Sequence, residues 1–171
     1  MKQPSLLSHL RDIILLPFTV TVIIPYLIYD SGQTFIPGMV VIKIAGFILL
    51  AAGITLLFYT IFLFGTVGKG TLAAWSETQK LVIQGPYKYT RNPMISGVLF
   101  ILIGEALLFH STNILIWAGI FFVINNLYFF FKEEPDLEKR FGDDYRRYKQ
   151  NVPRWVPRVK AYEDKNKGTN K

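Results

Sequence analysis

The sequence contains no cysteine and only two histidines among its 171 residues. The missing cysteines exclude disulfide bonds, thiolate nucleophiles and cysteine metal ligands. His9 and His110 lie far apart in the sequence, so they do not form a metal-binding motif. We therefore expect no metal site, and chemistry that needs no covalent thiolate intermediate.

Charged residues are also scarce, at 18% of the chain, whereas hydrophobic residues make up 51% and aromatic residues 15%. With a mean hydropathy of +0.30, the chain is too apolar for a soluble domain of this length. A net charge of +7 could suit nucleic acid, but the basic residues collect between and after the apolar runs. The composition thus predicts a membrane protein with no nucleic-acid partner.

Four apolar runs approach or exceed the length needed to cross ~30 Å of hydrocarbon. The first contains Pro17 and Pro25 and should be kinked, since neighbouring helices can satisfy the carbonyl groups that proline leaves free. Only residues 110–113 separate the last two runs, which should form an antiparallel hairpin. The predicted fold is an all-α polytopic membrane protein with four transmembrane helices, at residues 13–29, 39–64, 94–109 and 114–131.

The basic residues predict the orientation of the chain. All but one of the 19 Lys and Arg residues lie in the N-terminal start, in the connection of residues 65–93 or after residue 131. The exception, Lys43, lies near one end of the second run, where its ammonium group can reach the lipid headgroups. Because cytoplasmic segments of membrane proteins are rich in Lys and Arg, we expect both termini in the cytoplasm.

The third run contains one carboxylate and two glycines. Glu105 would lie deep enough in the membrane to need a protein partner or water. It is either a neutral or paired structural acid or a functional one. Gly97 and Gly104 have no side chains, so they would allow another helix to approach this one closely.

In the fourth run, Asn126, Phe130 and Glu133 follow one another at i, i+4 and i+7 and share one helical face. This predicts a polar stripe that leads toward the cytoplasmic end of the helix. Polar groups are costly inside a membrane, which favours a function for them. We therefore expect Asn126 to contact the substrate.

A polar stretch, residues 85–93, directly precedes the third run and contains turn-forming residues, Lys88 and Arg91. The carboxylates Glu133 and Glu134 should lie on the same side of the membrane. They sit about 100° apart on a helix, so one can bind a ligand while the other pairs with Arg91. We expect a site for a ligand that carries both charges. In the alternative, both glutamates pair with neighbouring lysines and arginines at a solvated helix end.

After residue 131 the sequence becomes strongly charged, and four apolar or aromatic residues recur at helical spacing. This predicts an amphipathic helix along the membrane surface. Residues 152–158 then end the helix with two prolines and add an interfacial tryptophan. We assign residues 1–158 to one membrane domain and residues 159–171 to a flexible basic tail. The recurring residues of the helix are Leu137, Phe141, Tyr145 and Tyr148.

These motifs, in this order and spacing, resemble the isoprenylcysteine carboxyl methyltransferase and phospholipid methyltransferase family in its prokaryotic form. The resemblance covers residues 68–158, more than half of the chain. It is carried by Gly68-Lys69-Gly70-Thr71, by Gly85-Pro86-Tyr87-Lys88-Tyr89-Thr90-Arg91-Asn92-Pro93, by Glu133-Glu134, and by Phe141-Gly142, Tyr145, Tyr148 and Val152-Pro153.

The resemblance implies an enzyme of the prokaryotic inner or plasma membrane that uses S-adenosylmethionine to methylate a lipophilic or lipid acceptor at the cytoplasmic face. It implies that residues 68–158 form the cofactor region and that Arg91 and Glu134 are catalytic. Asn92 stands where the eukaryotic isoprenylcysteine enzymes have histidine, which bears on a prenylcysteine substrate and not on the cofactor. The implied cofactor-binding residues are Gly85, Pro86, Tyr87, Tyr89, Arg91, Asn92, Pro93, Glu133 and Glu134.

Methyl transfer from a sulfonium also suits the composition, because the donor is already activated and needs neither a metal nor a thiolate. Two alternatives are considered. One is an NADPH-dependent membrane reductase of the sterol-reductase type, which has a similar arginine-proline loop. The other is a membrane scaffold without catalytic activity.

Overall fold

The computed structural model describes residues 14–30, 39–63, 66–67 and 81–163, and every regular element within these ranges is a helix. The predicted all-α class is confirmed. Two elements have π-type hydrogen bonding, in which a carbonyl pairs with the N–H five residues later. In chain order the elements are η1 (Ile14–Ile23, π), α2 (Ile24–Ile28), α3 (Val40–Leu63), η3 (Gly85–Lys88, 3-10), α4 (Pro93–Leu108), α5 (Thr112–Tyr128), η4 (Phe129–Glu133, π) and α6 (Glu134–Asn151).

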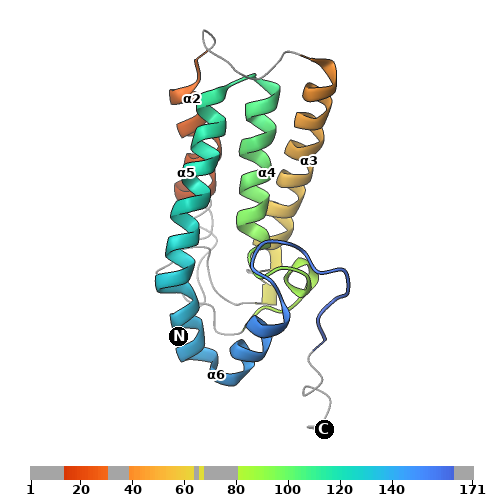
Figure 1. The fold of residues 1–171 in the computed structure, drawn as a ribbon, viewed down its shortest axis with the longest axis vertical. Helices are drawn as coiled ribbons and strands as arrows, with labels where there is room; N and C mark the ends of the chain where they lie inside the picture. Colours follow the sequence, from red (N-terminus) through yellow and green to blue (C-terminus); the bar gives the residue numbers. More distant parts are fainter. Residues whose placement is uncertain (1–13, 31–38, 64–65, 68–80, 164–171) are drawn as a thin grey trace.

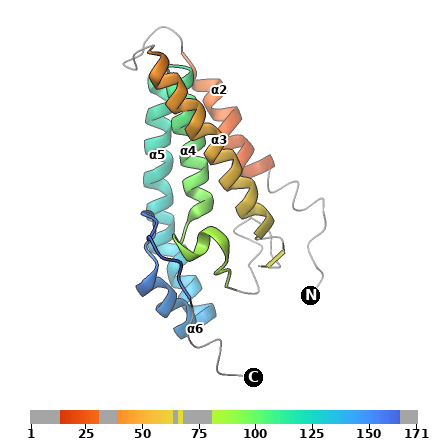
Figure 2. The ribbon, with the colours of Figure 1, turned by 90° about the vertical axis from the view of Figure 1, so that its right-hand side faces the viewer.

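The continuous η1 and α2, together with α3, α4 and α5, stand side by side as a bundle, with α6 at one end (Figure 1). These helices match the four predicted apolar runs closely. The largest difference is at the end of the fourth run, where α5 ends at Tyr128 instead of residue 131 and continues as η4. Figure 2 shows that α3 crosses α4 at an angle and that α5 lies on the other side of α4.

The second proline of the first helix, Pro25, is accommodated by the neighbouring helix α5. In the π pattern of η1, the carbonyl of Val20 would pair with residue 25, but Pro25 has no N–H to donate. The indole N–H of Trp117 donates to this carbonyl instead, at 3.1 Å. A second contact, from Asn113 Nδ2 to the carbonyl of Ile28 at 3.0 Å, fixes the other end of the pair. Neighbouring side chains thus satisfy the first helix, as the sequence predicted.

Glycines allow α3 and α4 to touch through their backbones. A Cβ atom on Gly53 would lie 2.7 Å from both the carbonyl oxygen of Gly97 and the amide nitrogen of Ile101. Gly46, seven residues before Gly53, and Gly104, seven residues after Gly97, form a second contact of the same kind, where a Cβ on Gly104 would lie 2.8 Å from the Gly46 oxygen. The predicted close approach at Gly97 and Gly104 is confirmed, and α3 is the partner helix.

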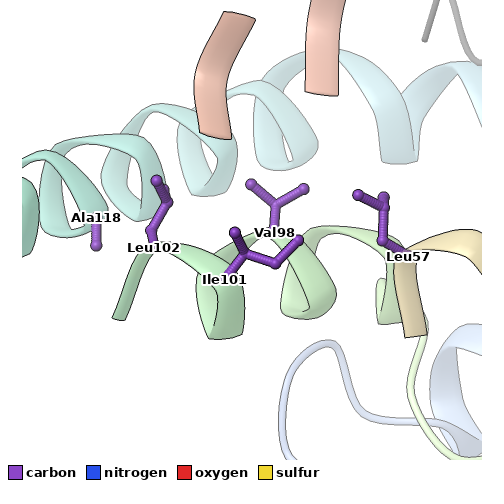
Figure 3. Packing of buried hydrophobic residues seen from close by; sticks show 5 residues of the cluster. All are labelled: Leu57, Val98, Ile101, Leu102 and Ala118. Atoms are coloured by element: carbon purple, nitrogen blue, oxygen red, sulfur yellow. The ribbon is translucent and has the colours of Figure 1, made fainter. Parts of the chain in front are cut away.

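The apolar core lies between α3, α4 and α5, next to this glycine contact. Figure 3 shows its buried side chains, with α4 in the middle. Leu102 is fully buried, and no cluster member is more than 7% exposed. The core therefore fixes the position of α4. The loop of the candidate site, residues 85–92, directly precedes the first residue of this helix. The cluster consists of Leu57, Val98, Ile101, Leu102 and Ala118.

The outer faces of the bundle expose large apolar side chains, such as Phe47, Phe58 and Phe62 of α3, which are 65%, 63% and 62% exposed. Apolar surface of this extent on a helix bundle indicates contact with lipid instead of water. Within the described residues, two helices are long and apolar enough to cross a membrane: α3, and the continuous helix of residues 112–151 that contains α5, η4 and α6. The first helix and α4 are apolar but shorter.

The last described residues pack against the end of α6. Tyr162, which belongs to the predicted basic tail of residues 159–171, is 8% exposed and packs against Tyr148 and Val152. Residues 164–171 lie outside the described residues, as do the N-terminal start, residues 31–38 and the Gly68 to Thr71 element.

Candidate functional site

Glu134, the first residue of α6, is the centre of an ionic cluster at one end of the bundle. Its Oε1 accepts hydrogen bonds from Arg91 Nη1 at 2.9 Å and from Arg154 Nε at 2.8 Å. Its Oε2 lies 3.0 Å from Lys149 Nζ, which also donates to Glu138 at 2.7 Å. The side chains of Glu134 and Arg91 are only 7% and 11% exposed. The cluster therefore carries one net positive charge in a largely buried place.

Lys149 and Glu138, at the edge of this cluster, keep their charges at neutral pH. The hydrogen bond between Lys149 and Glu138 raises the pKa of the lysine and lowers the pKa of the glutamate. Burial, followed by the charge of Glu134, raises the pKa of Tyr145, whose hydroxyl lies 3.5 Å from Arg91 Nη1. Both oxygens of Glu134 are occupied by cations, so this carboxylate holds other residues in place.

A kink in α6 brings Lys149 back to the start of the helix. In a straight helix, residues 138 and 149 would lie about 16 Å apart along the axis. Gly142 has φ of 54° and ψ of −129°, so the helix bends back on itself (Figure 1). A side chain is strained at this φ, and glycine is not. Gly142 thus allows one short segment to supply both Glu134 and its cation Lys149.

The π turn η4 determines which glutamate enters the cluster. A π turn inserts one residue relative to α-helical spacing, so the side chains that follow it are rotated. Phe129 is 9% exposed and faces the protein, whereas Phe130 is 61% exposed and faces away. On the predicted face of Asn126, Phe130 and Glu133, Phe130 is exposed, and Phe129, three residues after Asn126, is the ring that packs inward. Glu134, not Glu133, pairs with Arg91.

Glu133 has a separate environment beside the cluster. Burial raises its pKa above the ordinary value of 4.5, although a hydrogen bond from the hydroxyl of Tyr128 and the charge of Arg140 oppose this shift. The two adjacent glutamates therefore have different surroundings, with Glu134 between three cations and Glu133 beside a phenol. The expected pairing of one glutamate with Arg91 is present, and binding of a ligand by the other glutamate stays a prediction.

The loop of residues 85–92 carries Arg91 and has a tightly determined conformation. Gly85 has φ of 53°, a backbone conformation in which other residues are strained, and a Cβ atom there would lie 2.8 Å from the hydroxyl of Tyr59 and would displace it. Tyr87 is buried, which raises its pKa well above 10, and its carbonyl accepts a hydrogen bond from the Tyr148 hydroxyl at 2.6 Å. Arg91 thus projects from a rigid loop.

Residues 152–162, which we call the strap, run back along this loop from the end of α6 (Figures 1 and 2). The N–H of Arg91 donates to the carbonyl of Pro153 at 2.9 Å, and Thr90 Oγ1 donates to the carbonyl of Arg154 at 2.8 Å. Further along, the strap donates two backbone hydrogen bonds of 3.0 Å to the loop, from Arg158 to Tyr89 and from Tyr162 to Lys88. The strap therefore places Arg154 next to Arg91.

Trp155 attaches the strap to α5. Its indole N–H donates to Asn126 Oδ1 at 2.9 Å, and its ring lies 5.2 Å from the ring of Phe122 and 6.1 Å from that of Phe129. Asn126 Nδ2 donates within α5, to the carbonyl of Phe122 at 3.1 Å. The side chain of Asn126, which we expected at the substrate, thus holds the strap in this structure.

Replacing Trp155 with phenylalanine should lower the free energy of unfolding by about 1 kcal/mol, because it removes one partly buried hydrogen bond and keeps a ring between Phe122 and Phe129. Replacement with alanine should cost about 3 kcal/mol, because the ring contacts are lost as well. Thermal unfolding in detergent, followed by circular dichroism, measures both. If the phenylalanine variant unfolds like the wild type, the hydrogen bond to Asn126 does not hold the strap.

The structure thus brings the predicted loop and the predicted acidic pair together, through Arg91 and Glu134. Asn92 occupies the N-cap position of α4 but makes no side-chain capping hydrogen bond. The sequence reasoning missed Lys149 and Arg154. The sequence offers one signal for Arg154, which lies in a short segment with two prolines and a tryptophan. That segment predicts contact with the membrane interface and does not by itself predict an ion pair with Glu134.

Comparison with known proteins assigns the chain to a family. The profile of the phospholipid methyltransferase family matches residues 41–144, which include α3, the loop, α4, α5 and the first half of α6. The chain belongs to the phospholipid methyltransferase family. An uncharacterized protein of Haemophilus influenzae is 50% identical over 46 residues, which are 26% of this chain and 73% of that protein.

Membership of the phospholipid methyltransferase family indicates a membrane methyltransferase, in agreement with the apolar surface of the bundle. The match includes Arg91 and both glutamates, but it ends at residue 144, before Lys149 and Arg154. These two cations of the cluster therefore come from a part of the chain beyond the matched region.

Proposed function

We propose that this protein transfers a methyl group from S-adenosylmethionine to a lipophilic or lipid acceptor, through a carboxylate or an amine, at the cytoplasmic face of a prokaryotic membrane. The observation that carries the proposal is the buried Arg91–Glu134–Arg154 contact. It joins the loop, the start of α6 and the strap into one polar centre at the end of an apolar bundle. A polar centre between lipid and cytosol suits a polar cofactor and an apolar acceptor.

The proposed topology has four transmembrane helices, at η1 with α2, α3, α4 and α5, and both termini in the cytoplasm. Three features support it: the apolar outer faces of the bundle, the basic residues at the α6 end, and the family's membrane association. In this arrangement residues 1–158 form one domain, whose cofactor region is residues 68–158.

The residues of the site fit S-adenosylmethionine, whose amino acid part carries an ammonium and a carboxylate. Among the described residues, the buried Nε of Arg91 has no hydrogen-bond partner, and a buried charged donor without an acceptor is costly. An anionic group bound beside Arg91 would satisfy it. Glu133, outside the cluster, is the carboxylate for the ammonium group.

When bound, S-adenosylmethionine supplies an activated methyl group on its sulfonium. The protein's part is then to bind, to orient and to exclude water. Arg91 holds a carboxylate of the cofactor or the acceptor, Glu134 fixes Arg91 and Arg154, and the strap covers the loop. The phenols of Tyr87, Tyr145 and Tyr148 have raised pKa values and stay protonated, so they do not act as bases.

Glu133→Gln should weaken binding of S-adenosylhomocysteine about tenfold or more at neutral pH, because an ionised partner of the ammonium group is lost. In the wild type, the affinity for S-adenosylhomocysteine should also decrease as the pH is lowered, because Glu133 becomes protonated. Since burial raises the pKa of Glu133, this loss should begin above pH 4.5, whereas the Gln variant should show a flat profile there. Isothermal titration calorimetry of the purified protein measures both.

The fall in affinity would not reflect unfolding through Glu133 itself. A carboxyl group whose pKa is raised in the folded state stabilises the fold at low pH, and that stabilisation is lost as pH rises through the folded pKa.

NADPH serves as the control ligand. Thermal protection by NADPH and not by S-adenosylmethionine would contradict the proposal and favour a reductase.

A further inference from the structure

We infer that the strap lies in the membrane interface, with Val156 and Val159 against lipid and Lys160 at anionic headgroups. The inference rests on the membrane placement proposed above and adds a lipid-binding surface that includes a wall of the active site. Trp155 fixes the height of the strap on the bundle through its hydrogen bond to Asn126.

Trp155 reaches a part of α5 that belongs to its apolar run. Its indole N–H donates to Asn126, which precedes the end of the run at Phe131 by five residues. At 1.5 Å per residue this is about 8 Å, so the indole lies in the outer part of the hydrocarbon, close to the interface where tryptophan is enriched in membrane proteins. The next strap residues must therefore lie near the same level.

The strap directs two valines outward at this level. Val156 is 75% exposed and Val159 is 97% exposed. They are not part of a frayed end, because Val152 and Tyr162 on either side are 1% and 8% exposed and the Arg158 N–H is bound to Tyr89. A segment held at both ends presents these apolar side chains to whatever surrounds it. Because the bundle beside them is apolar and lies in a membrane, the two valines contact lipid.

The charges of the strap select an anionic surface. Residues 152–162 contain Arg154, Arg158 and Lys160 and no acidic residue. Arg154 is held by Glu134, whereas Lys160 is exposed next to Val159. Exposed valines flanked by cations are typical of segments that insert apolar side chains below anionic headgroups. The occupant of this surface is therefore the lipid bilayer.

This placement has a consequence for the acceptor. The strap exposes Val156 to lipid and, two residues earlier, holds Arg154 beside Arg91. A lipophilic acceptor that diffuses along the membrane would meet the strap directly beside the ionic cluster. The acceptor class that fits is an interfacial lipid with its reactive group at headgroup level, not a molecule confined to the bilayer centre.

Spin labels can measure the depth of the strap, and a chain without cysteine allows each label to be placed alone. The variants are Val159→Cys in the strap, Phe58→Cys on the exposed face of α3, and Asp143→Cys on α6, where the side chain is 78% exposed. Each is reconstituted into vesicles that contain phosphatidylglycerol. Collision rates with oxygen, which enriches in lipid, and with a water-soluble nickel chelate are then compared.

We expect the oxygen-to-nickel ratio at Val159→Cys to approach that at Phe58→Cys and to exceed that at Asp143→Cys several-fold. The ratio should fall when phosphatidylcholine replaces the anionic lipid. A label at position 159 that behaves like position 143, while position 58 reports lipid, overturns the inference and leaves the proposed function intact. An aqueous signal at position 58 as well overturns the membrane placement and the inference together.

Discussion

Glu134→Ala should destabilise the protein by about 3–5 kcal/mol, the range for removing one partner of a buried ion pair. The variant leaves Arg91, Lys149 and Arg154 within one largely buried cluster without the carboxylate that holds them together. Like charges then repel at short range, and their hydrogen bonds are not replaced. Chemical unfolding in detergent, followed by circular dichroism, gives the free energy of unfolding of the variant and the wild type.

Asp143→Ala is the matched control. Asp143 also forms an ion pair in α6, with Arg146 at 3.2 Å, but both side chains are more than half exposed. An exposed i, i+3 pair contributes little, so this variant should stay within about 0.5 kcal/mol of the wild type. Glu134→Gln should fall between the two, since the amide keeps one acceptor and loses the charge. Similar stabilities for Glu134→Ala and Asp143→Ala would contradict a central role for the cluster.

These contacts give Glu133 and Glu134 different roles. A carboxylate that already binds three cations has little attraction left for a ligand's ammonium group. Glu134 therefore acts through Arg91 and Arg154, and Glu133 is the better candidate for direct contact with the cofactor. Glu134→Gln should therefore weaken both stability and binding, whereas Glu133→Gln should weaken binding alone.

The limits of the sequence reasoning are physical. Apolar runs predicted the helices because burial and lipid contact both follow local composition, and the charges placed Arg91 and the glutamates on one side. The π turn η4 was not predictable, since its five residues also suit an α-helix. Spacing rules assume 3.6 residues per turn, and the residue that a π turn inserts brings Glu134 to the place where α-helical spacing puts Glu133.

The strap was missed for a different reason. Its hydrogen bonds to the loop of residues 85–92 join residues more than 60 positions apart, as between Thr90 and Arg154, and no local pattern encodes such a pairing. The helix contact at Gly97 and Gly104 was predictable on one side only. Glycine at both positions indicated that some helix comes close, whereas Gly46 and Gly53 of the partner became recognisable only when α3 was seen beside α4.

Gly53→Ala should cost about 1–3 kcal/mol, the usual penalty for overpacking, although alanine is the better helix former by about 1 kcal/mol. The new methyl group would lie 2.7 Å from the backbone of both Gly97 and Ile101, and neither backbone can move without shifting α4. Gly119→Ala on α5 is the control, because nothing lies within 4 Å of a Cβ there. That variant should match or exceed the wild type in thermal stability.

The same substitution should also weaken S-adenosylhomocysteine binding, although Gly53 is remote from the ionic cluster. Helix α4 begins at Pro93, two residues after Arg91, so a displaced α4 moves the loop that presents this guanidinium to Glu134. Calorimetry should show lower affinity for Gly53→Ala and unchanged affinity for Gly119→Ala. Reduced stability with unchanged affinity would mean that the strap and α6 hold Arg91 in place without help from the packing of α3 on α4.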